Sequence, residues 1–356
     1  MLSLDEIRRL PKVTLHDHLD GGVRPQTVVD LCRENGHPLP TTDADELQQW
    51  IYAQCDAGNL VDYLKPFELT VAGMQTPEQL ARVAHEFVLD MAADGVVYAE
   101  TRWAPELHQR RGMGLARAVE AVRDGLASGM AEATAQGSPV MARQLLVSMR
   151  HDEPTLRIAE LAVEYRDQGV AGFDIAGAEE GFPPSRHREA FDYLKRNNAH
   201  FTIHAGEAFG LPSIWEAVQL CGAERLGHGV RIVEDIDVSG PRPVLGRLAA
   251  YVRDARIALE LAPTSNLQTG IATTMAEHPI SLLFDLGFRV TVNCDNRLMS
   301  NTTLSKEFAA LHEAFGWGPE EMRRCAISAM HSAFWDHQER ERIITEVIRP
   351  AYLKAS

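Results

Sequence analysis

Eight short runs of apolar and β-branched residues recur along the chain, and longer stretches with the apolar spacing of helices separate them. This alternation is typical of repeated βα units, whose strands lie parallel. Several runs are almost continuously apolar, as expected for buried parallel strands. The predicted strands are residues 12–18, 95–102, 140–149, 170–175, 200–204, 225–228, 256–261 and 288–295.

Chain length agrees with eight such units. The chain has 356 residues, and (β/α)₈ barrels span roughly 200 to 400. We therefore predict an α/β fold, a (β/α)₈ TIM barrel, with extra helices between Thr41 and Gly73, after the first strand, and from Thr303 to the C-terminus. The first of these insertions is a candidate lid. No repeat, low-complexity tract or linker marks a boundary, so residues 1–356 are predicted to form one domain.

Composition narrows the class of partner. There are 35 Lys and Arg against 50 Asp and Glu, a net charge of −15 that repels nucleic acid. No apolar run approaches the roughly 18 residues of a membrane helix, and the segment Met1–Lys12 lacks the apolar core of a signal peptide. The five cysteines are scattered without a CxxC pair, which favours a reducing cytoplasm. We expect a soluble cytoplasmic protein with a small-molecule substrate, and the sequence does not indicate an oligomeric state.

Histidines and an aspartate stand where predicted strands end. His16 and His18 are two residues apart, so a strand points both to one face. Such a pair alone fits a packing role as well as a metal site. His204, His228 and Asp295 end the fifth, sixth and eighth predicted strands, and in a barrel these ends surround the mouth where active sites lie. Three nitrogens and one oxygen suit zinc with a position left for water, although other divalent ions tolerate such ligands.

Three further residues are candidates at the same mouth. Glu207 follows His204 by three residues, at the opening of a predicted helix, where an acidic residue needs no function. Beside a metal, a carboxyl kept protonated by burial is suited to donate a proton to a substrate ring nitrogen. Asp20 and Gly177 fit ordinary turns by spacing alone, while Asp20 is also able to hold a substrate hydroxyl and Gly177 to offer a backbone N–H.

Four motifs stand together in this chain: PKVTLHDHLDGG (11–22), HAGE (204–207), RLGHG (225–229) and TVNCDNRLMS (291–300). In this order and spacing they resemble the adenosine deaminase family of the amidohydrolase superfamily, over about residues 8 to 350. Two further segments, residues 172–179 and 201–214, look like its actinobacterial branch.

This resemblance implies one zinc ion per chain, held by His16, His18, His204 and Asp295. It further implies that Glu207 protonates purine N1 and that His228 orients or deprotonates the attacking water, which Asp295 also touches. A single metal is implied because no lysine ends the fourth predicted strand, where two-metal relatives carry a carboxylated one.

The implied substrate contacts are His18, Asp20 at the ribose 5′-hydroxyl, Gly177 at purine N3 and Asn296 at N7, with Ser265 supporting the site. Asn296 stands where better-known members have a second aspartate. An amide donates to N7 at any ordinary pH, whereas an aspartate must be protonated to do so.

The implied reaction is hydrolytic deamination of adenosine and 2′-deoxyadenosine to inosine and deoxyinosine with release of ammonia, as in purine salvage. Adenine and 6-aminodeoxyfutalosine are the alternative substrates. Members that act on free adenine typically resemble HxHLEG, whereas this chain has Asp20 at that point. AMP is not expected as the substrate, because its phosphate would need a basic cluster and the motifs have none near them. A catalytically silent nucleoside-binding protein is the alternative from another class, and the complete set of catalytic residues argues against it.

Overall fold

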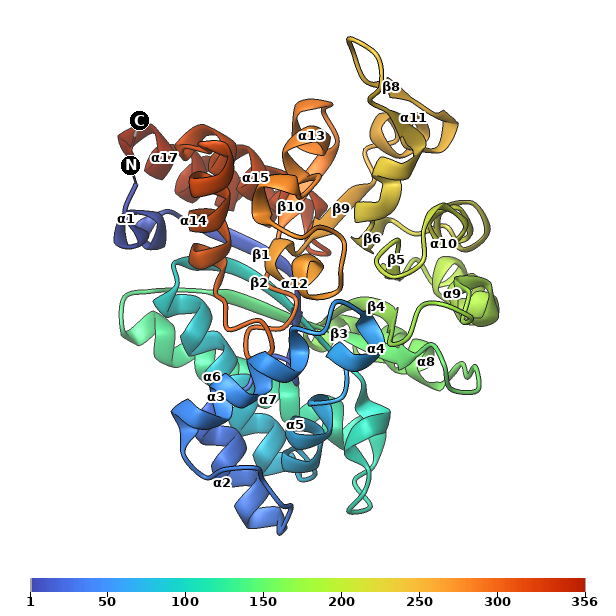
Figure 1. Cartoon of the computed structure of the whole chain (residues 1–356). Helices are drawn as coiled ribbons and strands as arrows, with labels where there is room; N and C mark the ends of the chain where they lie inside the picture. Colours follow the sequence, from blue (N-terminus) through green and yellow to red (C-terminus); the bar gives the residue numbers. More distant parts are fainter. Residues whose placement is uncertain (1, 356) are drawn as a thin grey trace.

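The computed structural model describes residues 2–355, which form a closed barrel of eight parallel strands surrounded by helices (Figure 1). Strands β1 to β4 make one sheet, and a second sheet has the order β10-β9-β6-β5. Parallel bridges between Asp17 and Asp295 and between Phe173 and Phe201 join the two sheets at both seams. A closed barrel has no free strand edge. The predicted (β/α)₈ fold is confirmed.

The strands of the barrel lie close to the predicted runs. They are β1 (Lys12–His18), β2 (Val96–Trp103), β3 (Met141–Met149), β4 (Val170–Ala176), β5 (Thr202–Ala205), β6 (Arg225–His228), β9 (Ala258–Leu261) and β10 (Arg289–Val292). A small antiparallel pair, β7 (Ile236–Asp237) and β8 (Val244–Leu245), lies outside the barrel.

Four of the predicted strand ends were wrong: β2, β4 and β5 each end one residue later than predicted, and β10 ends three residues earlier. Strand β10 ends at Val292, and Asp295 follows it with a left-handed φ of 60° that an extended strand excludes. Strand β5 runs one residue past His204, to Ala205.

Helices follow the strands and cover the barrel. They are α1 (Leu4–Arg9), α2 (Pro25–Asn35), α3 (Ala44–Cys55), α4 (Leu60–Tyr63), α5 (Phe67–Gly73), α6 (Pro77–Ala93), α7 (Leu115–Ala135), α8 (Arg157–Glu164), α9 (Arg188–Arg196), α10 (Leu211–Trp215), α11 (Arg247–Asp254), α12 (Pro263–Gln268), α13 (Ile280–Asp285), α14 (Leu304–Phe315), α15 (Pro319–Ser332), α16 (His337–Arg342) and α17 (Arg349–Ala355). Shorter helical turns are η1 (Pro105–His108), η2 (Arg166–Gln168), η3 (Pro184–His187), η4 (Glu216–Cys221), η5 (Val230–Asp235), η6 (Met275–Glu277) and η7 (Ile343–Ile348).

Both predicted sets of extra helices are present. The insertion after β1 holds α3, α4 and α5, and the C-terminal segment holds α14 to α17 (Figure 1). Within residues 2–355, none of the helices has the length and apolar character needed to cross a membrane. All five cysteines are buried and free.

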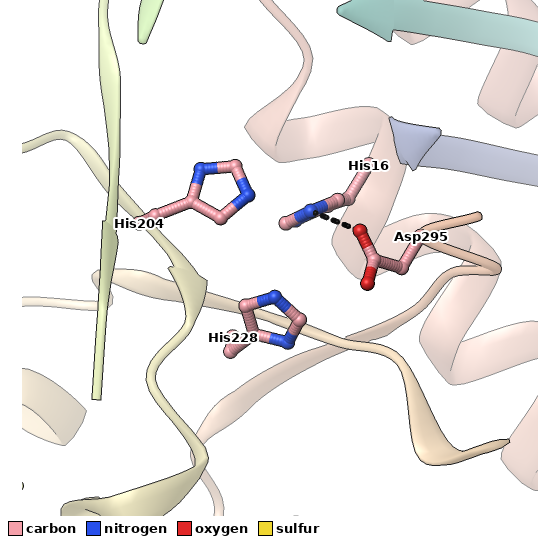
Figure 2. A group of neighbouring side chains, drawn as sticks. All are labelled: His16, His204, His228 and Asp295. Atoms are coloured by element: carbon pink, nitrogen blue, oxygen red, sulfur yellow. Dashed lines mark ion pairs between the residues drawn. The ribbon is translucent and has the colours of Figure 1, made fainter. Parts of the chain in front are cut away.

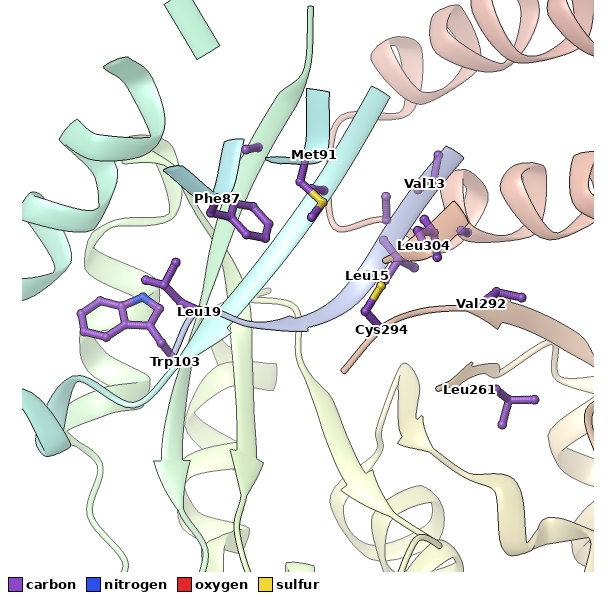
Figure 3. Close-up of a cluster of buried hydrophobic side chains, with 14 of the residues drawn as sticks. Val13, Leu15, Leu19, Phe87, Met91, Trp103, Leu261, Val292, Cys294 and Leu304 are labelled. Atoms are coloured by element: carbon purple, nitrogen blue, oxygen red, sulfur yellow. The ribbon is translucent and has the colours of Figure 1, made fainter. Parts of the chain in front are cut away.

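The apolar core lies between the strands and the helices around them (Figure 3). Val13 and Leu15 of β1 belong to it, together with Phe87 and Met91 of α6. Because side chains alternate along a strand, the residues between and after Val13 and Leu15 point to the other side, into the barrel. His16 is one of these inward residues, and it is fully buried.

The barrel interior contains charged side chains in place of apolar ones. Arg102 of β2 lies 2.7 Å from Asp174 of β4 and 2.7 Å from Glu260 of β9. Arg225 of β6 lies 2.6 Å from Glu100 of β2 and 2.6 Å from Glu260. These five side chains are at most 1% exposed. We call them the interior ion network, and burial makes each charge dependent on its partners.

Arg225→Met leaves Glu100 and Glu260 each short of a buried cation. The free energy of unfolding should fall by about 3–5 kcal/mol, because an uncompensated buried charge costs that much. Urea unfolding followed by fluorescence measures the loss. The matched control is Arg323→Met, which breaks a surface pair with Glu320 and should cost less than about 1 kcal/mol. Equal losses in the two variants would contradict the assigned role of the network.

Candidate active site

The predicted site residues meet at the mouth formed by the carboxyl ends of the strands. There they line a cavity of about 410 Å³. Its outer wall comes from the insertion after β1, where α4 and α5 contribute apolar side chains such as Leu60, Phe67 and Val71. The predicted residues that line the cavity are His18, Asp20, Gly177, His204, Glu207, His228, Asp295 and Asn296. His16 lies fully buried beside them.

A group of imidazoles and one carboxylate converges at the base of this cavity (Figure 2). His16, His204, His228 and Asp295 each bring one potential ligand atom within 4.8 Å of the others. His18 reaches the same point, since its Nε2 lies 3.2 Å from His204 Nε2 and 3.3 Å from Asp295 Oδ1. Five side chains therefore compete for the positions around one ion.

Two buried carboxylates set which nitrogens face the centre. Glu260 Oε2 lies 3.1 Å from His16 Nδ1, and Asp174 Oδ2 lies 2.8 Å from His204 Nδ1. A carboxylate accepts a hydrogen bond from Nδ1–H, so the lone pair of Nε2 in each ring points into the site. His16 Nε2 then faces Asp295 Oδ1 at 3.1 Å. Two electron-rich atoms at that distance need a cation between them.

The spacing fits a metal ion. With Zn–N distances of about 2.0–2.1 Å, neighbouring ligands of a tetrahedral zinc stand about 3.3 Å apart. Three of the separations within the set His16, His18, His204 and Asp295 are known: 3.1 Å from His16 to Asp295, 3.3 Å from His18 to Asp295 and 3.2 Å from His18 to His204. These three separations are compatible with a bound metal ion.

Asp295 stays ionised in this environment. Burial alone raises the pKa of a carboxyl, but the surrounding imidazoles, His16 first and then His228 and His18, outweigh it. The pKa of Asp295 consequently lies well below its ordinary value. Ser265 donates a hydrogen bond of 2.7 Å to Asp295 Oδ2, which places Ser265 where the sequence resemblance expected support.

Glu207 has the opposite character. Burial is the main cause that raises the pKa of its carboxyl well above the ordinary value, and the charges of Asp295 and Glu179 add to the effect. The raised pKa favours the protonated form of this side chain, which lines the cavity. Its Oε2 lies 3.6 Å from His228 Nε2. A neutral acid at this position can give a proton to a bound heterocycle.

The loop that carries Glu207 is fixed by one buried carboxylate. Glu179 accepts backbone hydrogen bonds from Gly206 at 2.6 Å, Glu207 at 3.0 Å, Ala208 at 2.7 Å and Phe209 at 2.9 Å. Four donors on one carboxylate hold the backbone of this loop in place. Glu179 therefore positions the acid.

Two candidate substrate-binding residues line the cavity, Gly177 through its backbone and Asp20 through its side chain. Gly177 has a φ of 103°, and a side chain there would meet His151 Nδ1 at 2.8 Å. Only glycine leaves its backbone N–H exposed to the cavity in this conformation. Asp20 is 5% exposed, and its Oδ1 has no hydrogen-bond partner within residues 2–355. Burial raises the pKa of Asp20 to about 6, so it is largely ionised at neutral pH and accepts hydrogen bonds.

Asn296 is held by a chain of hydrogen bonds that ends on a backbone carbonyl. Gln268 Nε2 donates to Met299 O at 3.3 Å, so Gln268 Oε1 accepts from Ser300 Oγ at 2.6 Å. Tyr63 then donates to Ser300 at 3.3 Å, and Asn296 Nδ2 donates to the Tyr63 oxygen at 3.0 Å. The amide nitrogen carries a second N–H that this chain does not use.

Comparison with known proteins identifies the family of this chain. A sequence model of the family described as adenosine deaminase matches residues 11–350. The chain belongs to the adenosine deaminase family. The curated relative adenosine deaminase 1 of Streptomyces coelicolor is 58% identical over 352 residues, which is 98% of this chain and 89% of the relative. The predicted family, and with it the prediction of a hydrolytic enzyme, is confirmed.

Solved structures show the same fold. Arabidopsis N6-mAMP deaminase superposes with a TM-score of 0.82 at 25% identity, over 99% of this chain and 100% of that protein. An amidohydrolase from Burkholderia ambifaria, solved with bound zinc, gives a TM-score of 0.82 at 24% identity, over 100% and 94% of the two chains.

Several residues of this adenosine deaminase family site were not predicted. Asp174, Glu260 and Arg102 lie inside strands and act through the histidines, and Glu179 acts through a loop. Charged residues at inward positions of otherwise apolar strands were the available signal for the first three. Nothing in the sequence pairs Glu179 with residues 206–209, because this contact forms only when adjacent loops of the barrel meet.

Glu179→Gln replaces a carboxylate by a side chain with one acceptor oxygen and an NH₂ that faces backbone N–H groups. We expect the amides of residues 206–209 to exchange hydrogen at least about tenfold faster, because buried N–H groups lose partners. Hydrogen–deuterium exchange with mass spectrometry measures this. Glu180→Gln, at the exposed neighbouring position, is the control and should leave the same peptide unchanged; unchanged exchange in Glu179→Gln would contradict the role.

Proposed function

We propose that this enzyme hydrolyses adenosine and 2′-deoxyadenosine at purine C6, giving inosine or deoxyinosine and ammonia. The observation that carries the proposal is a buried carboxyl with a raised pKa, Glu207, beside a converging group of imidazoles and the carboxylate of Asp295 in one cavity. The 58% identity to a protein named adenosine deaminase supports the same reaction.

The metal of this proposal is one zinc ion per chain, held by His16, His18, His204 and Asp295. Three separations of 3.1–3.3 Å between their ligand atoms support this set. Zinc held by these residues would lower the pKa of bound water toward about 7 and so would supply the nucleophile at neutral pH.

The chain's own residues then divide the chemistry. Glu207 donates its proton to N1, which withdraws electrons from C6 and prepares that carbon for attack. His228 and Asp295 hold the attacking oxygen on one face of the ring. One water is consumed and one ammonia leaves, so the purine gains a C6 oxygen in place of its amino group.

Substrate recognition follows from the lining of the cavity. We assign the ribose 5′-hydroxyl to Asp20, whose buried Oδ1 lacks a partner within residues 2–355. Gly177 offers its N–H to N3, and the free N–H of Asn296 Nδ2 is suited to N7. His18 lines the cavity beside them, so it is both a metal ligand and a contact to the substrate.

The cavity favours an uncharged nucleoside over a nucleotide. Its two Lys or Arg side chains within residues 2–355 are Lys65 and Arg110. Arg110 pairs through two hydrogen bonds of 2.7 and 2.8 Å with Glu68, and Lys65 pairs with Asp62. A phosphate would have to compete with these carboxylates. Deamination of adenine or 6-aminodeoxyfutalosine on the same site is the alternative.

The proposal also covers the domain organisation, the location and the partner of this enzyme. We propose one catalytic domain over the whole chain, because β1, β5, β6 and the segment after β10 all contribute to the site. Five buried free cysteines support a reducing cytoplasm as its location. We propose a small purine nucleoside as the partner, with neither nucleic acid nor membrane.

Ultraviolet absorbance during incubation tests the reaction. Purified protein of known metal content is given adenosine, 2′-deoxyadenosine, adenine, 6-aminodeoxyfutalosine and AMP in parallel. Turnover of the two nucleosides, with little of AMP or adenine, is expected. Turnover of adenine or 6-aminodeoxyfutalosine alone would move the specificity, and no turnover by zinc-loaded protein would leave a nucleoside-binding role.

The roles of Glu207 and His204 are separable. Glu207→Gln removes the transferable proton and should lower kcat by roughly 10²–10⁴-fold with metal content unchanged. His204→Asn should lower both turnover and bound zinc, measured by plasma emission on dialysed protein. Equal loss of metal in the two variants would contradict this division.

The raised pKa of Glu207 predicts a direction of pH dependence. A group with a raised pKa keeps its proton below that pKa and loses it as pH rises through it, so kcat should fall on the alkaline side. Stopped-flow rates with adenosine across the pH range measure this limb. A flat alkaline limb in the wild-type enzyme would show that Glu207 is not the acid.

The proposed role of Asp20 can be tested with a substrate that lacks the ribose 5′-hydroxyl. Asp20→Ala should lower kcat/KM for adenosine by roughly 10- to 150-fold, because a hydrogen bond to a charged group contributes about 1.5–3 kcal/mol. The same variant should treat 5′-deoxyadenosine almost as wild type does. Asp20→Asn keeps an acceptor oxygen and serves as the control. Equal losses on both substrates would refute the 5′-hydroxyl contact.

A further inference from the structure

Two buried residues that the proposed chemistry does not use form a hydrogen-bonded chain behind His228: Asn266 contacts His228, and His278 contacts Asn266. Asn266 Nδ2 lies 3.1 Å from His228 Nδ1, and Asn266 Oδ1 lies 3.2 Å from His278 Nε2. The backbone N–H of Ile280 donates to His278 Nδ1 at 3.1 Å. Asn266 and His278 are 0% and 2% exposed. Water therefore does not compete for these groups.

The direction of every hydrogen bond in this chain follows from its backbone end. An amide N–H only donates, so His278 Nδ1 must accept and its proton must sit on Nε2. His278 Nε2 then donates to Asn266, which must present its oxygen. The amide NH₂ of Asn266 is thereby turned to His228, whose Nδ1 accepts. A neutral His228 consequently carries its proton on Nε2.

We propose that His278 and Asn266 are positioning residues that hold the proton of His228 on Nε2, so that His228 enters the cavity as a hydrogen-bond donor. Burial supports a neutral His278, because it lowers the pKa of that ring to about 3.

This assignment excludes His228 from the metal ligands among the five converging side chains. A metal ligand must offer a lone pair, and a protonated Nε2 has none. His16 and His204 have the opposite arrangement, since carboxylates face their Nδ1 atoms. His228 faces an amide donor at the same ring position. The group that faces Nδ1 thus distinguishes these rings. An amide makes His228 a hydrogen-bond donor, and carboxylates make His16 and His204 metal ligands.

The assignment also limits what His228 can do in the reaction. An imidazole that already holds a proton on Nε2 cannot take a second one at that atom. His228 therefore orients the attacking oxygen by donation, and it is not the base that deprotonates it. This catalytic consequence rests on the proposed deamination, whereas the position of the proton does not.

Nitrogen NMR of the zinc-loaded protein, labelled with ¹⁵N-histidine at mildly alkaline pH, tests the proposal directly. The signals of His228 are assigned by their loss in His228→Asn. The expected wild-type pattern is a protonated Nε2 and an unprotonated Nδ1. A protonated Nδ1, with Nε2 either free or metal-bound, would overturn the proposal whether or not adenosine is deaminated.

Asn266→Asp provides the matched variant, because it keeps the shape and removes the donor. Both carboxylate oxygens accept, so the proton of neutral His228 should move to Nδ1. We expect the ¹⁵N pattern to reverse and kcat/KM for adenosine to fall roughly 10- to 100-fold with zinc content unchanged. If His228 were a ligand, this change would give it the same support as His16 and His204, and activity would be kept.

Another pair of variants tests the hydrogen bond between His278 and Asn266. His278→Gln places an amide NH₂ where Nε2 stood and should preserve the proton of His228 on Nε2. His278→Leu removes the donor, frees the Asn266 amide to turn, and should give a mixture of the two forms of His228. Identical spectra for these two variants would show that His278 does not set the direction. Failure of deamination in the wild type would reject the proposed function alone.

Discussion

The position of Arg102 between Asp174 and Glu260 is the interaction on which the rest of the site depends. Each of these carboxylates also faces Nδ1 of a histidine, Asp174 that of His204 and Glu260 that of His16. Arg102 compensates their charge in a barrel interior that water does not reach. Without it, the carboxylates would take up protons and would no longer orient the two rings.

Rigidity follows from this arrangement. The histidine ligand candidates stand on strands, and Asp295 stands on the segment after β10. The interior ion network joins the strands across the barrel, and Glu179 holds the loop of Glu207. His228 and Asp295 have left-handed φ values of 62° and 60°. Such conformations are uncommon outside glycine and persist where the surroundings fix them. The fold accepts local strain to aim these two side chains.

The same ring chemistry is used in two ways within one group. Where a carboxylate faces Nδ1, the far nitrogen presents a lone pair, and where an amide NH₂ faces Nδ1, the far nitrogen presents a proton. Histidines with identical side chains can thereby act as ligand and donor a few ångströms apart. The distinction lies in Asp174, Glu260 and Asn266, which do not face the substrate cavity.

The sequence by itself determined the alternation of strands and helices, the residues at the strand ends and the likeness to one family, because periodicity and motif spacing are local properties of the chain. It missed the end of β10 by three residues, since the turn at Asp295 has no compositional marker. Only the tertiary structure decided which side chain lies behind each imidazole. Glu260 meets His16 across 244 positions and Asn266 meets His228 across 38, and closure of the barrel creates these pairs.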